Sequence, residues 1–457
     1  MPKHELRAAA SLAAVFSVRM LGLFMIYPVF ALAARGLSGA TPYTIGIALG
    51  IYGLTQGLLQ MPFGLLSDRI GRKPMVVAGL ILFGLGSAWA ASAHSMATMI
   101  AGRALQGAGA VGSVILALVA DLTAEENRTK AMAMVGMTIG LSFLVAIIAG
   151  PLLSAWIGVS GIFWMMSVLA LVGIAITLFV VPAPRRTRVH REAEPVAALI
   201  GSALRNTQLL RLDFGIFALH AMLTASFLVV PALFASTLRL PGRSEWLVYL
   251  PILLLSVVVM LPTIILGERR RRMKGVLVGA VAALAVSQFM LAFGSGDSVM
   301  LLAALTVFFA GFNIMEASLP SLVTKTAPPG GTGTATGVYS SSQFLGIFAG
   351  GVAGGWIHQH GGTAEVFEFA GALALVWLVL AATMRAPSYF ASRVVRLGEG
   401  RGADGAGLAA ALRALPGVAE AVVVADEGVA YLKVDSKLFD PQKAAALAGA
   451  PLQTAAG

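Results

Sequence analysis

The sequence predicts an all-α membrane protein of twelve spanning helices in two six-helix bundles, followed by a small α+β domain. Three observations predict this fold class. The 457 residues are 58% hydrophobic and only 12% charged, whereas soluble proteins carry about 25% charged residues. Apolar runs of about 20 residues, the length that crosses a bilayer, recur along the chain. After residue 385 these runs stop and short alternating patterns replace them.

The apolar runs follow one another with short turns between them. In chain order they cover residues 9–34, 43–66, 74–93, 97–121, 129–155, 161–182, 212–236, 246–267, 275–294, 298–323, 334–357 and 364–385. The longest interior polar segment divides them into six and six. We therefore expect a first bundle over 1–182, a cytoplasmic linker over 183–211, a second bundle over 212–385 and a cytoplasmic domain over 386–457.

Basic residues are distributed unevenly over the turns. One set of alternate turns, which includes the N-terminus and the linker, holds nearly all of them, and the other set holds only Arg35, Arg239 and Arg243. The positive-inside rule therefore places both termini in the cytoplasm. This asymmetry also explains the net charge of +11 and argues against nucleic-acid binding. The first apolar run lacks a small-residue cleavage site, so we expect a retained helix and not a signal peptide.

The last 72 residues, 386–457, predict a separate fold. Alternation and helical periodicity give the order strand, helix, strand, strand, helix, over 393–399, 407–415, 419–425, 429–435 and 441–448. This order is that of a ferredoxin-like domain. The tail ends soon after its second helix, so the sequence does not show whether the fourth strand of that fold is present. The chain has no cysteine, which excludes disulfides, thiol catalysis and a Cys-x-x-Cys metal loop.

A short cationic turn lies between the second and third apolar runs. It covers 64–74 and has the pattern G-x-L-x-D-R-x-G-R-K, with the carboxylate at Asp68. A charged hairpin between two spanning helices must lie at a membrane face. An offset of 200 residues places Glu268 on Asp68 and Arg272 on Arg72, which indicates an internal duplication. Glycines at small-x-x-x-small spacing, Gly136/Gly140 and Gly346/Gly350, predict close helix packing.

Several polar side chains lie at membrane depth. Charged groups there are costly and face the bundle interior or water. Arg19, Arg103, His220 and Glu316 are of this kind. Asp121 follows Arg103 by 18 residues, or five helical turns, so both lie on one face about 27 Å apart.

Two roles for Glu316 stay open from the sequence. A buried carboxyl can carry a proton, and it can equally form a static salt bridge with Arg19 or Arg103. His220 can titrate near neutral pH or serve as a hydrogen-bonded packing residue. His358 and His360 form a surface pair without a third ligand, so we expect no metal site.

The turn at 64–74 resembles the signature loop between helices 2 and 3 of major facilitator superfamily transporters. Gly102–Gly107 with Arg103 and Gln106 resembles the R-x-x-Q-G pattern of helix 4 in that family. The resemblance implies that Asp68 caps a helix of the other half and that Arg72 pairs with Asp121, which latches the halves when the outer side is open. The implied latch residues are Gly64, Asp68, Arg69, Gly71, Arg72 and Asp121.

Two further sets of residues follow from the same resemblance. Gly140, Gly150 and Pro151 resemble the Gly-Pro motif of the antiporters, in which a pliable fifth helix closes the route between the halves; Ser154 and Ala155 depart from it. The residues expected at the central cavity and in proton coupling are Arg19, Gln56, Arg103, His220 and Glu316.

A closer resemblance extends over nearly the whole chain. The similarity is to YajR-type members of the family, and it is carried by the tail and by five stretches: 19–25, 51–56, 64–74, 127–133 and 337–346. The resemblance implies a bacterial inner-membrane protein that exports small molecules by proton antiport. The implied energy source is the proton gradient, without a bound cofactor, and the implied partners are substrate, protons and the lipid bilayer.

Other classes of function fit the sequence less well. The glycine-rich segment 330–337 lacks the Gly-Lys-Ser/Thr ending of a nucleotide-binding loop, so ATP is not the expected energy source. No catalytic triad, metal cluster or paired-carboxylate constellation indicates an enzyme. A uniporter, a symporter, or a sensor in which the tail signals remain as alternatives. The ligand of the tail, or its self-association, is left open.

Overall fold

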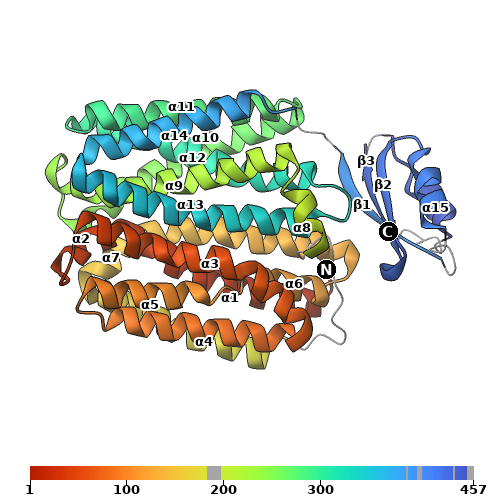
Figure 1. Cartoon of the computed structure of the whole chain (residues 1–457), viewed down its shortest axis with the longest axis horizontal. Coiled ribbons are helices and arrows are strands. Elements are labelled where there is room, and N and C mark those ends of the chain that lie inside the picture. The colour runs from red at the N-terminus through yellow and green to blue at the C-terminus, as the bar shows by residue number, and fades with distance from the viewer. Residues whose placement is uncertain (183–196, 387–389, 399–403, 436–437, 450–457) are drawn as a thin grey trace.

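The computed structural model describes residues 1–182, 197–386, 390–398, 404–435 and 438–449. The first part of the expected linker, residues 183–196, and the position of a fourth strand after the last helix lie outside these ranges. The helices form one elongated bundle with the small domain beyond one end (Figure 1). The N-terminus lies at that same end of the bundle.

The first half of the chain is helical from its third residue. Its helices are α1 (Lys3–Met25), α2 (Tyr27–Ala33), α3 (Pro42–Ile70), α4 (Arg72–Ala91), α5 (Met96–Ala108), α6 (Gly112–Leu122) and α7 (Glu125–Ala175), which ends in the π-helical turn Ile176–Val180. Capping boxes at Thr41 and Ser95 start α3 and α5. The expected run 97–121 is broken at Gly109, where a Cβ would overlap the carbonyl oxygen of Gly79.

The second half is also helical. Its helices are α8 (Ala197–Ala203), α9 (Thr207–Ser236), α10 (Trp246–Arg269), α11 (Met273–Gly294), α12 (Ser298–Thr326), α13 (Thr332–His360) and α14 (Thr363–Ala382). α9 begins at Thr207, inside the segment expected as linker, because the Asn206 side chain caps its first turn.

Within the described ranges, nine helical segments are long and apolar enough to cross a membrane. The longest of them, Lys130–Val180, contains two arms that meet at Gly158, whose φ of 68° only glycine adopts at little cost. α3 and α13 are also of spanning length, at 29 residues each, but carry more glycine and polar residues. With the two arms counted separately and α3 and α13 added, the twelve predicted spans are accounted for.

The small domain has the predicted order of elements. It consists of β1 (Ala391–Arg396), α15 (Gly405–Arg413), β2 (Val418–Val424), β3 (Val429–Val434) and α16 (Pro441–Ala448). The strands form an antiparallel sheet in the order β1-β3-β2. Gly428, at φ 67°, closes the β2–β3 turn. Leu408 and Leu412 of α15 pack with Ala421 and Leu432 of the sheet in a core of their own.

The small domain contacts the end of α12 and the turn that follows it. Lys433 of β3 is 4% exposed, and its Nζ donates a hydrogen bond to the carbonyl oxygen of Thr324 at 2.8 Å. The ring of Tyr431 packs beside Gly330. The sheet therefore sits against the end of the bundle through a polar bond and an aromatic contact.

Candidate functional site

The two halves meet along α3 and α13, where glycines bring the backbones together. A Cβ on Gly46 would overlap the carbonyl oxygen of Gly351, and one on Gly50 would lie 2.9 Å from that of Phe348. A Cβ on Gly355 would lie 2.6 Å from the carbonyl oxygen of Pro42. We call Gly46, Gly50, Gly351 and Gly355 the glycine seam. It lies toward the end of the bundle opposite the turn at 64–74, so that end is closed.

A second contact between the halves lies at the same closed end. Tyr27 of α2 is fully buried, and its hydroxyl lies 3.1 Å from Thr224 Oγ1 of α9. Its ring packs against that of Phe227, with centroids 5.6 Å apart. Neither Tyr27 nor Thr224 was singled out from the sequence, because a lone polar group in an apolar run does not show which helix it faces.

Arg19 and Gln56, two of the predicted cavity residues, are in direct contact. Arg19 Nη2 donates to Gln56 Oε1 at 2.6 Å and to the hydroxyl of Tyr52 at 3.1 Å. Gln56 continues this network by donating to Gln60 Oε1 at 3.1 Å. All four residues come from α1 and α3, so the network belongs to the first half. Tyr52 is a member that the sequence analysis missed.

Arg103 is held within the first half. Its Nε donates to the carbonyl oxygen of Ala48 at 3.2 Å and its Nη1 to Gln106 Oε1 at 2.6 Å. The guanidinium also lies over the ring of Tyr52, 5.1 Å from the centroid. Backbone and amide oxygens thus satisfy this buried cation. Among the described residues no ion pair joins Glu316 to Arg19 or Arg103, so the salt-bridge alternative is not found here.

Glu316 lies instead in a cluster with His220 and Gln343. Gln343 Nε2 lies 2.8 Å from His220 Nε2 and donates to Glu316 Oε1 at 3.4 Å. His220 Nε2 lies 3.8 Å from Glu316 Oε2, and His220 Nδ1 lies 3.3 Å from the carbonyl oxygen of Ile216. A ring that donates from Nδ1 to Ile216 accepts from Gln343 at Nε2, which is the neutral form. The cluster joins α9, α12 and α13, and the sequence analysis missed Gln343.

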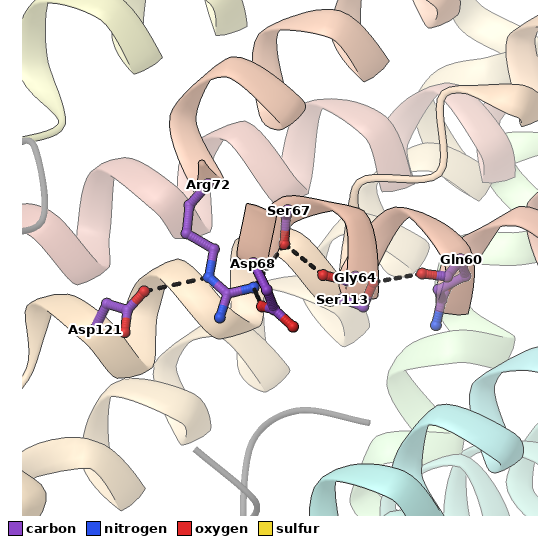
Figure 2. A network of polar contacts seen from close by, with 7 residues as sticks. All are labelled: Gln60, Gly64, Ser67, Asp68, Arg72, Ser113 and Asp121. Carbon is purple, nitrogen blue, oxygen red and sulfur yellow. Dashed lines mark hydrogen bonds and ion pairs between the residues drawn. The ribbon is translucent and has the colours of Figure 1, made fainter. Parts of the chain in front are cut away.

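The turn between α3 and α4 is organised around Arg72 (Figure 2). The Arg72 side chain is 1% exposed, and its Nη1 lies 2.5 Å from Asp68 Oδ1 and donates to Ser67 Oγ at 2.6 Å. Its Nε donates to Asp121 Oδ2, at the end of α6, at 3.2 Å. Ser67 Oγ in turn donates to the carbonyl oxygen of Gly64. The Arg72–Asp121 contact implied by the family resemblance is therefore present.

Asp68 and Arg69, two further latch residues, are less enclosed than Arg72. Asp68 pairs with Arg72 of its own half, and no contact to a helix of the second half is found for it among the described residues. The resemblance assigns that capping contact to the arrangement in which the far end is open, and here the glycine seam closes the far end. Arg69 is exposed. Gly71, at φ 107°, makes the sharp turn from α3 into α4.

The residues of the fifth-helix motif have different surroundings in the structure. Gly150 of α7 packs against the break between α1 and α2, where a Cβ would lie 2.5 Å from the carbonyl oxygen of Met25 and 3.0 Å from Pro28. Pro151 follows inside the same helix. A Cβ on Gly136 or Gly140 would meet nothing within 4 Å, so the packing predicted for that pair is wrong. The other pair, Gly346 and Gly350, does pack against the backbone of α9.

Glu245, just before α10, is a buried carboxyl that the sequence did not single out. It is 2% exposed, and no hydrogen-bond partner is found for its Oε2 among the described residues. Burial raises the pKa of Glu245 from 4.5 to about 8. The group is therefore mainly neutral at pH 7.

We expect Glu245→Gln to stabilise the protein in a pH-dependent way. Below pH 4.5 the carboxyl is neutral in both folded and unfolded chains, so the variant and the wild type should have similar Tm values. Between pH 4.5 and 8 only the unfolded wild type ionises, so its stability falls relative to the variant; above 8 the difference is constant. Thermal unfolding in detergent across this range measures it. A Tm difference that does not change with pH contradicts the prediction.

No group of three or more His, Cys, Asp or Glu able to hold a metal ion is found among the described residues. Asp213 lies in the second turn of α9 and is buried. His358 and His360 lie at the end of α13 and belong to no such group in the described part of the chain.

Comparisons with known proteins agree with this architecture. The Major Facilitator Superfamily matches residues 12–351, and the YajR YAM domain matches residues 399–440. The inner membrane transport protein YajR of Escherichia coli (strain K12) is 43% identical over 438 residues, which are 96% of each chain. The multidrug resistance protein MdtH of Aeromonas hydrophila is 26% identical, over 75% of this chain and 85% of its own length.

Solved structures show the same fold at lower identity. The human organic anion transporter MFSD10 aligns with a TM-score of 0.61 and 18% identity, over 83% of this chain and the whole of its own. The nucleoside transporter NupG aligns with a TM-score of 0.64 and 13% identity, over 84% of this chain and the whole of its own. With its helical bundle, its basic signature turn and its small C-terminal sheet, the chain belongs to the Major Facilitator Superfamily of membrane transporters and carries a YajR YAM domain.

Proposed function

We propose that this multi-pass inner-membrane transporter exports small molecules in exchange for protons, by alternating access between its two bundles. The observation that carries the proposal is the cluster of Glu316, His220 and Gln343. It unites a titratable carboxyl and an imidazole inside the second bundle. Gln343 belongs to α13, the helix that also forms the glycine seam with the first bundle.

A proton on Glu316 changes the forces on α13. The ionised carboxylate accepts a charge-assisted hydrogen bond from Gln343, and protonation weakens it. The Gln343 amide also contacts His220 Nε2. A proton on that nitrogen turns it from an acceptor into a donor, so it can no longer accept a hydrogen bond from the amide. Proton binding thereby alters how α13 is held against α9 and α12, and so biases the seam between the bundles.

The first bundle supplies the polar groups for substrate. Arg19, Tyr52 and Gln56 form a connected donor and acceptor group at membrane depth. Both termini are placed in the cytoplasm on the charge asymmetry of the turns. The closed end with the glycine seam is then the outer side. The proton gradient supplies the energy, and no bound cofactor takes part.

Substrate-triggered proton flux in proteoliposomes tests the proposal. The vesicles hold a pH-sensitive dye, and a compound panel is added outside to wild type, Glu316→Gln and Glu368→Gln. Glu368 is an exposed carboxylate on α14 of the same bundle, so its variant controls for loss of charge. We expect one compound to move protons in wild type and Glu368→Gln but not in Glu316→Gln. If a compound is taken up but moves no protons in wild type or in either variant, the result supports a uniporter instead.

A sensor is the second candidate, and the contact of the small domain with the end of α12 and the turn after it favours it. In that case the tail passes on the state of the bundle and transport is incidental. Deletion of residues 386–457 distinguishes the two. A transporter keeps its flux without the tail, and a sensor loses its output.

A further inference from the structure

A groove of about 690 Å³ runs between α10, α11 and α12, on the second bundle. Leu255 and Val259 of α10 form one wall, and Gly275, Gly279 and Ala283 of α11 lie along another. The lining is almost wholly apolar. It therefore lies apart from the polar groups assigned above to substrate and proton.

Two glycines line this groove at positions where the packing of the helices would also admit a larger side chain. A Cβ on Gly275 or on Gly279 would meet nothing within 4 Å. This differs from the glycine seam, where a Cβ on Gly46 has no room. The open space at 275 and 279 thus leaves a volume for something other than the protein.

The groove opens toward the lipid. Only 22% of the most apolar stretch of α10 is buried, and Leu255 and Val259 are 50% and 42% exposed. A spanning helix that is so exposed borders the hydrocarbon of the bilayer. The occupant of the apolar part therefore carries hydrocarbon chains.

The groove ends at two exposed arginines, Arg270 and Arg272. The carboxylate of their own turn, Glu268, is engaged by Lys325, whose Nζ lies 2.5 Å from Glu268 Oε1. The turn as a whole is strongly cationic, with arginines at 269–272 and Lys274. An anionic group is the complement of this end, at the depth of the lipid headgroups.

The backbone of this turn supports a role for its charge. Arg271 has φ 52°, in the left-handed region that favours glycine, and its pseudo-equivalent in the first half is Gly71 at φ 107°. The bond from the Arg272 N–H to the Gly267 carbonyl oxygen, at 2.8 Å, closes the end of α10. Both turns need a left-handed residue, and here an arginine stands where glycine costs less.

We propose that this groove binds an anionic diacyl phospholipid. Arg270 and Arg272 hold the phosphate by charge-assisted hydrogen bonds, and an acyl chain lies along Gly275, Gly279 and Ala283. Basic pockets between spanning helices at the cytoplasmic side are suited to such headgroups. The site binds lipid as a ligand and is independent of the transported substrate.

Native mass spectrometry of the full-length protein in detergent tests the proposal. The probes are phosphatidylglycerol and phosphatidylcholine with the same chains, and inorganic phosphate as a competitor. The variants are Arg270→Gln/Arg272→Gln, which removes the headgroup contacts, and Gly279→Leu, which fills the groove. Each has a matched control: Lys3→Gln/Arg7→Gln removes two exposed charges at the same end, and Gly136→Leu adds the same side chain at an equally open site on α7.

We expect wild type and both controls to bind phosphatidylglycerol at least about tenfold more tightly than phosphatidylcholine. Each groove variant should lose this preference. Preference retained in Arg270→Gln/Arg272→Gln or in Gly279→Leu overturns the proposal. So does an equal loss in Lys3→Gln/Arg7→Gln, which indicates surface charge alone, or full displacement of the lipid by inorganic phosphate, which indicates an anion site without a chain. Gly275→Leu replaces Gly279→Leu if the latter does not fold.

Discussion

Gly46→Leu is expected to reduce transport by at least about tenfold while leaving the protein folded in the membrane. The Cβ alone would overlap the carbonyl oxygen of Gly351, so α3 and α13 cannot close with any larger residue at 46. Overpacking of this kind costs about 1–3 kcal/mol. Under the alternating access proposed above, this cost falls on the arrangement with the seam closed, so the equilibrium between arrangements should shift by about 5- to 150-fold toward the open one.

The chain contains no cysteine, which allows a direct measurement of this shift. Thr224→Cys places a single thiol at the closed end, where Thr224 is 0% exposed and contacts Tyr27. A membrane-impermeant maleimide added on that side should label it slowly in the Thr224→Cys background and quickly when Gly46→Leu is added. Gly136→Leu is the matched control, because a Cβ there meets nothing within 4 Å. Unchanged labelling in Gly46→Leu would show that the seam is not a gate.

The second large effect is expected in the basic turn, where Arg72→Gln and Asp68→Asn should differ. Arg72 is 1% exposed and contacts Asp121, whose side chain is 0% exposed. Breaking a buried ion pair costs about 3–5 kcal/mol, so Arg72→Gln should lower both the Tm in detergent and the turnover. Asp68 is 26% exposed and its loss leaves the Arg72–Asp121 pair, so Asp68→Asn should keep the Tm. It should abolish turnover, because Asp68 is one of the predicted latch residues.

Arg7→Gln is the control for this pair of variants, since Arg7 is an exposed arginine at the same end of the bundle. It should keep both Tm and turnover. Transport by Asp68→Asn at the wild-type rate would remove the latch role from Asp68. A wild-type Tm in Arg72→Gln would show that the buried pair contributes no net stability.

The sequence predicted the fold and one specific contact well. Hydropathy and the period of the patterns predicted the spanning helices and the order of strands and helices in the tail, because these depend on local composition. The contact between Arg72 and Asp121 followed from a motif in which a turn fixes one partner and a helix end fixes the other.

The partners of the buried groups were not predictable in the same way. The sequence left Arg19 and Arg103 as partners for Glu316, whereas the structure gives it Gln343 and His220. One sequence gives the depth of a residue along its helix but not the rotation of that helix or its neighbours. For the same reason Gly46 and Gly140 look alike in the sequence, and only the packing separates a seam from an open face.

The contact between Lys433 and Thr324 ties the small domain to α12, the helix that carries Glu316. The contact between Tyr431 and Gly330 ties it to the turn that leads into α13, the helix of Gln343. Any movement of α12 against α13 is therefore also work done on the small domain. A molecule that binds the small domain in only one of its positions would stabilise the arrangement of the bundle that goes with that position by its own binding free energy. By reciprocity, a transported compound that favours one arrangement of the bundle would change the affinity of the small domain for such a molecule by the same factor.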